Sequence, residues 1–127
     1  MRIVGKKLLI VEDDQDLQRI LIDVLTLEGA LPVAASDGAI ALSLASSQDF
    51  DLVVLDLNLP DMTGWDVLRG LQASQPGIAV VILTASADEA SRQRALAAGV
   101  VDYVFKPVAI RELVSLLQRR LGPDQES

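Results

Sequence analysis

Short apolar runs alternate with longer amphipathic stretches along nearly the whole chain. Five of the runs have the length and composition of β-strands, at residues 8–11, 31–35, 52–55, 80–83 and 103–105. The third and fourth runs are apolar at every position, which is typical of strands that other elements cover on both faces. The pattern therefore predicts a sheet in the interior of the protein.

The stretches between the runs have the spacing of amphipathic helices. The first helix is predicted from an apolar stripe with three- and four-residue steps, formed by Leu17, Ile20, Leu21, Val24 and Leu27. Gly29 then offers a C-terminal stop. A second helix is predicted over residues 38–46, with Ile40, Ala41 and Leu44 facing inward.

Two capping signatures predict the starts of the next helices. Thr63-x-x-Asp66 is a variant capping box, and Ser86-x-x-Glu89 is a stricter one. The third and fourth helices are thereby predicted at residues 65–73 and 87–98, and an apolar stripe predicts the last at residues 109–121.

A strand followed by a helix, repeated five times, defines the fold class. It implies an α/β, doubly wound domain: a parallel sheet with helices on both faces and right-handed crossovers. A single domain is expected over residues 1–127, with its core at about residues 7–121. Residues 122–127 are expected to be a tail or the start of a linker.

The composition removes several kinds of chemistry. The 127 residues include no cysteine and no histidine, which excludes disulfides, thiolate metal sites and catalysis by a Cys or His side chain. The formal net charge of −7 argues against nucleic-acid binding by this chain. The basic start lacks the apolar segment of a signal peptide, and no apolar run approaches the length of a membrane span. A cytoplasmic protein without membrane contact is expected.

Polar residues follow directly after four of the predicted strands. They are the acidic run Glu12-Asp13-Asp14, then Asp56, Thr84 and Lys106. In open parallel sheets, ligands bind beyond the carboxyl ends of the strands, so these side chains should share one edge. Acids, a hydroxyl and an amine gathered there point to a site for a divalent cation and a phosphoryl group.

Each of these residues also has a purely structural explanation. Asp14 is expected to cap the first helix, since Asp is a preferred N-cap, but three consecutive acids exceed what a cap needs. Asp56 could belong to a turn, and Thr84 and Lys106 taken singly are ordinary at strand ends. The functional interpretation therefore depends on the whole set of residues.

Four segments together resemble the response-regulator receiver domain of two-component signal transduction, of the CheY-like superfamily. They are residues 8–14, 55–64, 81–85 and 102–107, and their order and spacing fit as well. The resemblance covers residues 7–121. It implies a flavodoxin-like (βα)5 fold in which the strands, numbered along the chain, lie in the order 2-1-3-4-5.

The resemblance also assigns the acceptor and the metal ligands. Asp56 matches the phosphorylated aspartate, Asp13 the acid that binds Mg²⁺ directly, and Glu12 the acid that acts through water. Asn58 would supply its backbone carbonyl, and Mn²⁺ could replace Mg²⁺. Because Glu12, Asp13 and Asp56 repel one another, at least one of their pKa values should rise when no cation is present.

Three further residues match positions that contact or respond to the phosphoryl group. Thr84 and Lys106 match those that contact its oxygens, and the Lys106–Pro107 bond should be cis. Tyr103 matches the aromatic switch: once Thr84 moves, its ring can fill the space that is left. The surface expected to change is formed by residues 87–98, 103–105 and 109–121, and the resemblance allows a dimer through it.

These features predict a phospho-acceptor switch that catalyses only its own phosphorylation and dephosphorylation. The donor would be a histidine kinase or a histidine phosphotransfer protein, and the output is unknown. One rival is a small phosphatase of the haloacid dehalogenase type, which needs a second acid where Asn58 stands. The other is a degenerate receiver that acts only as a protein-interaction module.

Overall fold

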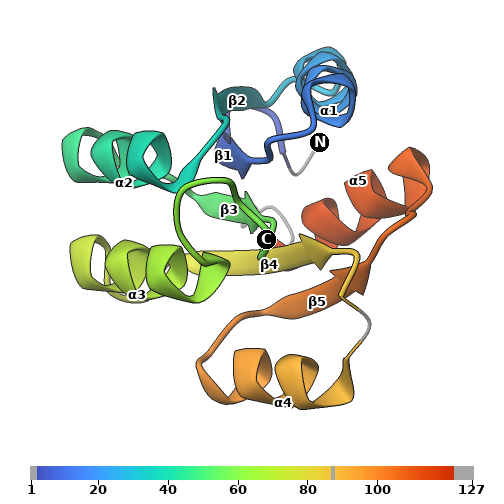
Figure 1. Ribbon diagram of the computed structural model, residues 1–127. Helices are drawn as coiled ribbons and strands as arrows, with labels where there is room; N and C mark the ends of the chain where they lie inside the picture. The colour runs from blue at the N-terminus through green and yellow to red at the C-terminus, as the bar shows by residue number, and fades with distance from the viewer. Residues whose placement is uncertain (1–2, 87, 122–127) are drawn as a thin grey trace.

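The computed structural model describes residues 3–86 and 88–121, which form one parallel sheet flanked by helices (Figure 1). The sheet has five strands in the order β2-β1-β3-β4-β5, as the family resemblance predicts. The strands are β1 (Lys7–Val11), β2 (Leu31–Ala35), β3 (Leu52–Leu55), β4 (Ala79–Thr84) and β5 (Asp102–Phe105). The predicted tail, residues 122–127, lies outside the described residues.

Five helices cover the two faces of the sheet. They are α1 (Gln15–Leu27), α2 (Gly38–Ser47), α3 (Gly64–Ser74), α4 (Glu89–Ala97) and α5 (Ile110–Arg120). Alternate strand residues point to opposite faces. Leu8 and Ile10 pack with α1 and α5 in one buried cluster, whereas Leu9 and Val11 pack with α2, α3 and α4 in another. The doubly wound prediction is therefore confirmed.

The fourth helix begins later than its predicted capping box. Its N-cap is Asp88, whose carboxylate accepts a hydrogen bond from the backbone N–H of Ala90. The prediction that Ser86 starts this helix is therefore wrong, because the nearer carboxylate caps the helix. By contrast, Thr63 caps α3 as predicted and accepts a hydrogen bond from the N–H of Asp66.

Three residues predicted to face the core lie outside it. Leu27 is 86% exposed, and Ile20 and Ile40 are also exposed. At 3.6 residues per turn, Ile20 and Leu27 lie about 100–120° around α1 from Leu21, which is buried in the core. The three- and four-residue steps therefore describe a stripe wider than the face that the sheet covers.

The described residues contain no helix with the length and apolar character needed to cross a membrane.

Gln75 joins the ends of α2 and α3. Its amide nitrogen donates to the carbonyls of Ala45 at 2.9 Å and Gln48 at 2.8 Å, which α2 leaves without helical partners. Its amide oxygen accepts the N–H of Phe50 at 3.0 Å. One side chain thus satisfies three backbone groups that lead into β3.

We expect Gln75→Ala to lower the free energy of unfolding by about 1–3 kcal/mol, because it leaves partly buried backbone groups without partners. Urea unfolding followed by circular dichroism measures this change. The control is Gln93→Ala, which removes only an exposed hydrogen bond to Glu89 and should change stability little. Equal effects of the two substitutions would contradict the role given to Gln75.

Candidate functional site

The acidic residues after β1 and β3 meet at the carboxyl edge of the sheet. Glu12 and Asp56 are buried, 2% and 4% exposed, and Asp13 beside them is exposed to solvent. Each offers a carboxylate oxygen, and these three oxygens lie within 4.8 Å of one another. The structure therefore brings together the three acids that the sequence predicts as metal ligands.

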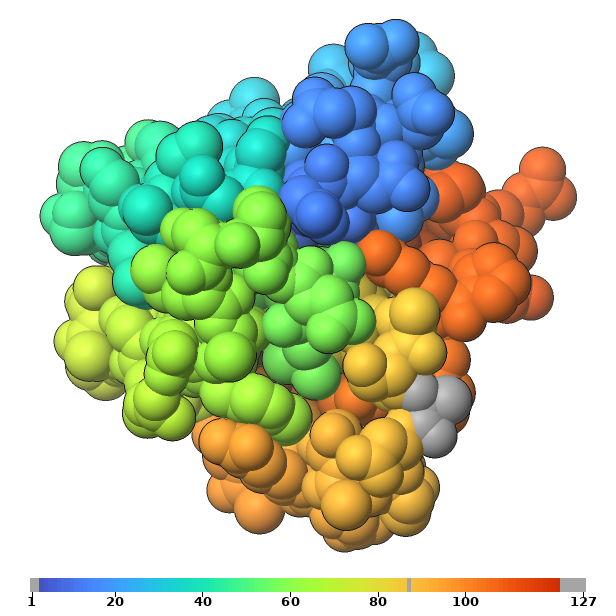
Figure 2. Space-filling model, viewed as in Figure 1, coloured from blue at the N-terminus to red at the C-terminus, as the bar shows by residue number. Residues whose placement is uncertain are grey.

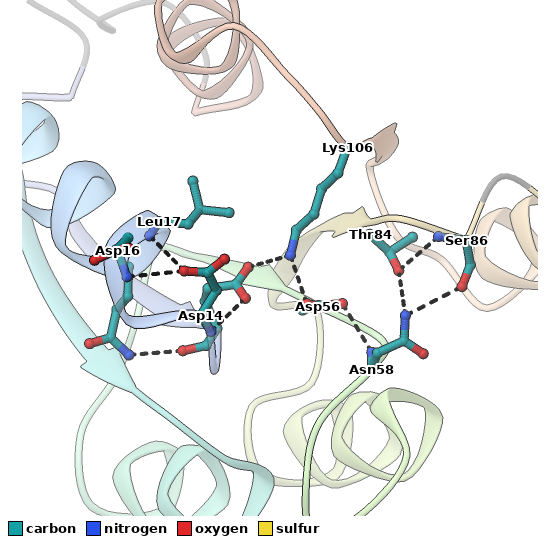
Figure 3. A network of polar contacts seen from close by, with 10 residues as sticks. Asp14, Asp16, Leu17, Asp56, Asn58, Thr84, Ser86 and Lys106 are labelled. Atoms are coloured by element: carbon teal, nitrogen blue, oxygen red, sulfur yellow. Dashed lines mark hydrogen bonds and ion pairs between the residues drawn. The ribbon is translucent and has the colours of Figure 1, made fainter.

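Lys106 reaches across from the end of β5 to two of these acids, and Figure 3 shows its contact with Asp56. Its Nζ lies 2.8 Å from Glu12 Oε1 and 2.9 Å from Asp56 Oδ2. The Lys106–Pro107 peptide bond is cis, as predicted. Burial of two carboxylates is costly unless they are paired, and Lys106 supplies the compensating charge.

The site shifts the pKa values of Glu12 and Lys106. Burial raises the pKa of the Glu12 carboxyl and the nearby Asp56 carboxylate adds to the rise, while the hydrogen bond from Lys106 opposes it. Burial alone would lower the pKa of Lys106, but its contacts with Glu12 and Asp56 outweigh burial and raise it. The raised pKa of Glu12 agrees in direction with the rise expected for one of the clustered acids, but its main cause is burial rather than repulsion.

The remaining site residues hold Asp56 and Thr84 in place. Asp56 Oδ1 accepts the backbone N–H of Asn58 at 3.0 Å, so both carboxylate oxygens have partners. The buried Thr84 hydroxyl accepts from the side-chain amide of Asn58 at 3.4 Å and from the N–H of Ser86 at 3.3 Å. Asn58 also reaches the hydroxyl of Ser86 at 3.4 Å. Asn58 therefore contacts both the predicted acceptor and the predicted switch residue.

Tyr103 is joined to the same network through the segment after β4. The residue is 7% exposed, and its hydroxyl donates to the carbonyl of Ser86 at 3.0 Å. Burial raises the pKa of this phenol, and the charge of Asp88 adds to the rise. The ring is thus already buried in this state, so an inward position does not require Thr84 to move first.

Two other polar residues near the site, Asp14 and Ser86, were both predicted as helix caps, and the structure confirms only the first. Asp14 is the N-cap of α1, as expected, with its carboxylate accepting from the N–H groups of Asp16 and Leu17. Ser86, predicted as a helix cap, instead contacts Thr84, Asn58 and Tyr103 through its backbone and side chain.

The model of the response regulator receiver domain matches residues 8–118 of the chain. This chain belongs to the response regulator receiver domain family. The receiver is similar to the transcriptional regulatory protein CusR of Escherichia coli (strain K12), with 37% identity over 115 residues that cover 91% of this chain and 51% of CusR. The chain spans about half the length of the curated relatives it matches.

Solved receivers share the fold. The non-phosphorylated HemR receiver domain from Leptospira biflexa superposes with a TM-score of 0.89 at 30% identity, covering 94% of this chain and 96% of that one. The receiver of the sensor histidine kinase PA1611 from Pseudomonas aeruginosa PAO1 superposes with a TM-score of 0.82 at 32% identity, covering 94% and 100%. That structure has a magnesium ion coordinated in its active-site cleft.

We expect Glu12→Gln to stabilise the metal-free receiver at neutral pH. Because folding raises the pKa of Glu12, the stability that this residue contributes is complete below its unfolded pKa and is lost as the pH rises through the raised value. Glutamine resembles the protonated form, so the advantage of the variant should shrink as the pH falls through the raised pKa. Urea unfolding in the presence of a chelator, repeated across this pH range, measures the difference in free energy of unfolding between the variant and the wild type.

Glu112→Gln is the matched control, because Glu112 is exposed in the first turn of α5. The effect of Glu112→Gln on the free energy of unfolding should not change with pH in the way expected for Glu12→Gln. If Glu12→Gln raised the free energy of unfolding by the same amount at every pH, the role assigned to the burial of Glu12 would be contradicted.

Proposed function

We propose that this receiver accepts a phosphoryl group on the carboxylate of Asp56 and acts as a switch in two-component signalling. The observation that carries the proposal is the setting of Asp56. It is buried at a strand end, with one oxygen held by the N–H of Asn58 and the other by Lys106. The donor would be a histidine kinase or a histidine phosphotransfer protein.

The acidic cluster fits a divalent cation. When ionised, its three carboxylates and the ammonium of Lys106 leave two negative charges without compensation. Mg²⁺ prefers oxygen ligands and keeps several waters, and the exposure of Asp13 leaves room for them. Glu12, Asp13, Asp56 and the backbone carbonyl of Asn58 would hold the ion, and Mn²⁺ suits the same oxygen donors.

The chain's own residues would supply position and charge for the transfer. A bound Mg²⁺ would neutralise charge on the oxygens of the transferring group. The Asp56 carboxylate would attack phosphorus in line while the bond from phosphorus to the donor breaks and the donor leaves, and Lys106 lies where it can pair with a phosphoryl oxygen. The hydroxyl of Thr84 would donate to another oxygen, and later hydrolysis of the acyl phosphate would reset the switch.

The conformational change caused by phosphorylation would be transmitted through the segment after β4. Thr84 would have to turn from Asn58 and Ser86 toward the phosphoryl group. Tyr103 holds the carbonyl of Ser86, so movement of this segment would reach the ring and the helix that follows. The responding surface would be α4, β5 and α5, and a dimer could form through it; a monomer with beryllofluoride bound would contradict the dimer.

The role of the whole protein is part of the same proposal. CusR is a transcriptional regulatory protein, and this chain matches only about half of its length. The net charge of −7 disfavours nucleic-acid binding by this chain, so an output would come through another domain or partner. We propose a cytoplasmic switch rather than an enzyme that turns over a foreign substrate.

We expect intact-mass spectrometry to detect one phosphoryl adduct after incubation with acetyl phosphate and Mg²⁺. The adduct should require Mg²⁺ and should be absent from Asp56→Ala, because that variant lacks the proposed acceptor. Asp51→Ala is the matched control, since Asp51 is an exposed acid at the opposite end of β3, and this variant should still be phosphorylated.

A lack of adduct would be followed by a test of beryllofluoride and Mg²⁺ binding. Failure to bind either would replace the proposal with an interaction module. Turnover of small phosphate esters would instead indicate a phosphatase.

We expect the backbone amides of α4 to exchange with deuterium faster than those of α3. The only large apolar side chain of α4, Leu96, is 38% exposed, and only Ala95 is buried. Arg94 of α4 stacks 4.0 Å from the centre of the Trp65 ring, and Gln72 of α3 donates to the carbonyl of Ala98, the C-cap of α4. Elements with little buried apolar area open most easily.

Arg94→Ala should destabilise α4 by a further ~0.5–1 kcal/mol through loss of the cation–π contact. Arg92→Ala, which removes only an ion pair within α4, is the control. Protection of α4 equal to that of α3 would contradict the proposed ease of switching.

A further inference from the structure

Asp61 lies in the loop after β3 but caps a helix elsewhere in the chain. Its Oδ1 accepts the N–H of Gly38 at 2.8 Å and its Oδ2 accepts the N–H of Ala39 at 2.9 Å. These are the first two residues of α2, and Figure 2 shows the green atoms of the loop against the teal atoms of that helix. The carboxylate also faces the positive end of the helix dipole.

Asp61 supplements a local cap, because the start of a helix leaves several N–H groups without helical partners. Asp37 is the N-cap, and its carboxylate accepts the N–H of Ile40 at 2.8 Å. Asp61 takes two different N–H groups from a position more than twenty residues away. What Asp61 adds is a fixed connection between the loop and the body of the protein.

The loop that Asp61 holds is closed at its base. Asn58 and Thr63 form an isolated antiparallel bridge, and the N–H of Gly64 donates to the carbonyl of Leu57 at 2.9 Å. The backbones are so close that a Cβ on Gly64 would lie 2.4 Å from the Cα of Leu57. The closed base and the anchored tip therefore act together to limit how far Asn58 can move.

We propose that Asp61 is a positioning residue that presets the loop for metal binding, through the carbonyl of Asn58. This rests on the proposed function, in which that carbonyl is a ligand. Mg²⁺ tolerates little departure from octahedral geometry, so a loop free to move would bind it more weakly. The same loop donates the N–H of Asn58 to Asp56, so its position also sets the orientation of the acceptor.

The test compares Asp61→Ala with Asp37→Ala. Each variant removes one carboxylate and a capping interaction at the same helix end, but only the first releases the loop. Calorimetric titration with Mg²⁺ should show affinity about 10-fold weaker for Asp61→Ala, the scale expected for residues that orient metal ligands. Asp37→Ala should change the affinity by less than about twofold, since it leaves the ligand geometry intact.

A second measurement uses the metal-free protein. Hydrogen exchange at the N–H of Gly64, which closes the base of the loop, should accelerate in Asp61→Ala and not in Asp37→Ala. If Asp61→Ala does not fold, Asp61→Asn serves instead, because it keeps one acceptor and should give an intermediate loss of affinity.

Equal Mg²⁺ affinities and equal exchange in the two variants would overturn the inference while leaving the proposed function intact. A wild-type protein that binds no Mg²⁺ would instead remove the proposed function. In that case, unchanged exchange at Gly64 in Asp61→Ala would still overturn the role of Asp61 in holding the loop.

Discussion

The ion pairs between Lys106 and the buried carboxylates of Glu12 and Asp56 constrain the whole carboxyl edge of the sheet. The three residues follow β5, β1 and β3, so the lysine reaches across β4 to meet them. Removing an ionised group from water costs roughly several kcal/mol of free energy, so each of these buried carboxylates needs a partner. The ion pairs thus add a charged link between the ends of three strands that the sheet already joins.

The placement of this charge follows from the layers of the fold. β1, β3 and β4 are covered on both faces, so almost every residue within them is apolar and buried. Polar side chains can appear only where the strands end and the helices have not begun. The fold therefore gathers its acids, its hydroxyl and its lysine at one edge, and a divalent cation would bring the remaining charge close to balance.

The loops at this edge differ in how firmly they are held. The loop after β3 is closed at its base and tied at its tip to α2 by Asp61. The segment after β4 leads into α4, which buries little and contacts α3 through one stacked arginine and one hydrogen bond. A tightly held loop beside a helix that buries little is an arrangement in which a local charge change can move a surface.

Much of the protein could be predicted from sequence, because its signals are local. Continuous apolar runs marked the strands and periodic stripes marked the helices. Asp56, Thr84 and Lys106 were found because they stand directly after such runs. The strand order and the roles of the site residues came from the family resemblance rather than from periodicity.

Tertiary structure decided what depends on partners far apart in the chain. Leu27 and Ile40 fit apolar stripes, yet both side chains are exposed in the folded protein. Asp88 rather than Ser86 caps α4, which leaves Ser86 to contact Asn58 and Tyr103. The link from Asp61 to α2 has no local signal, because its partners are backbone N–H groups that any sequence carries; only the folded chain brings them within hydrogen-bonding distance.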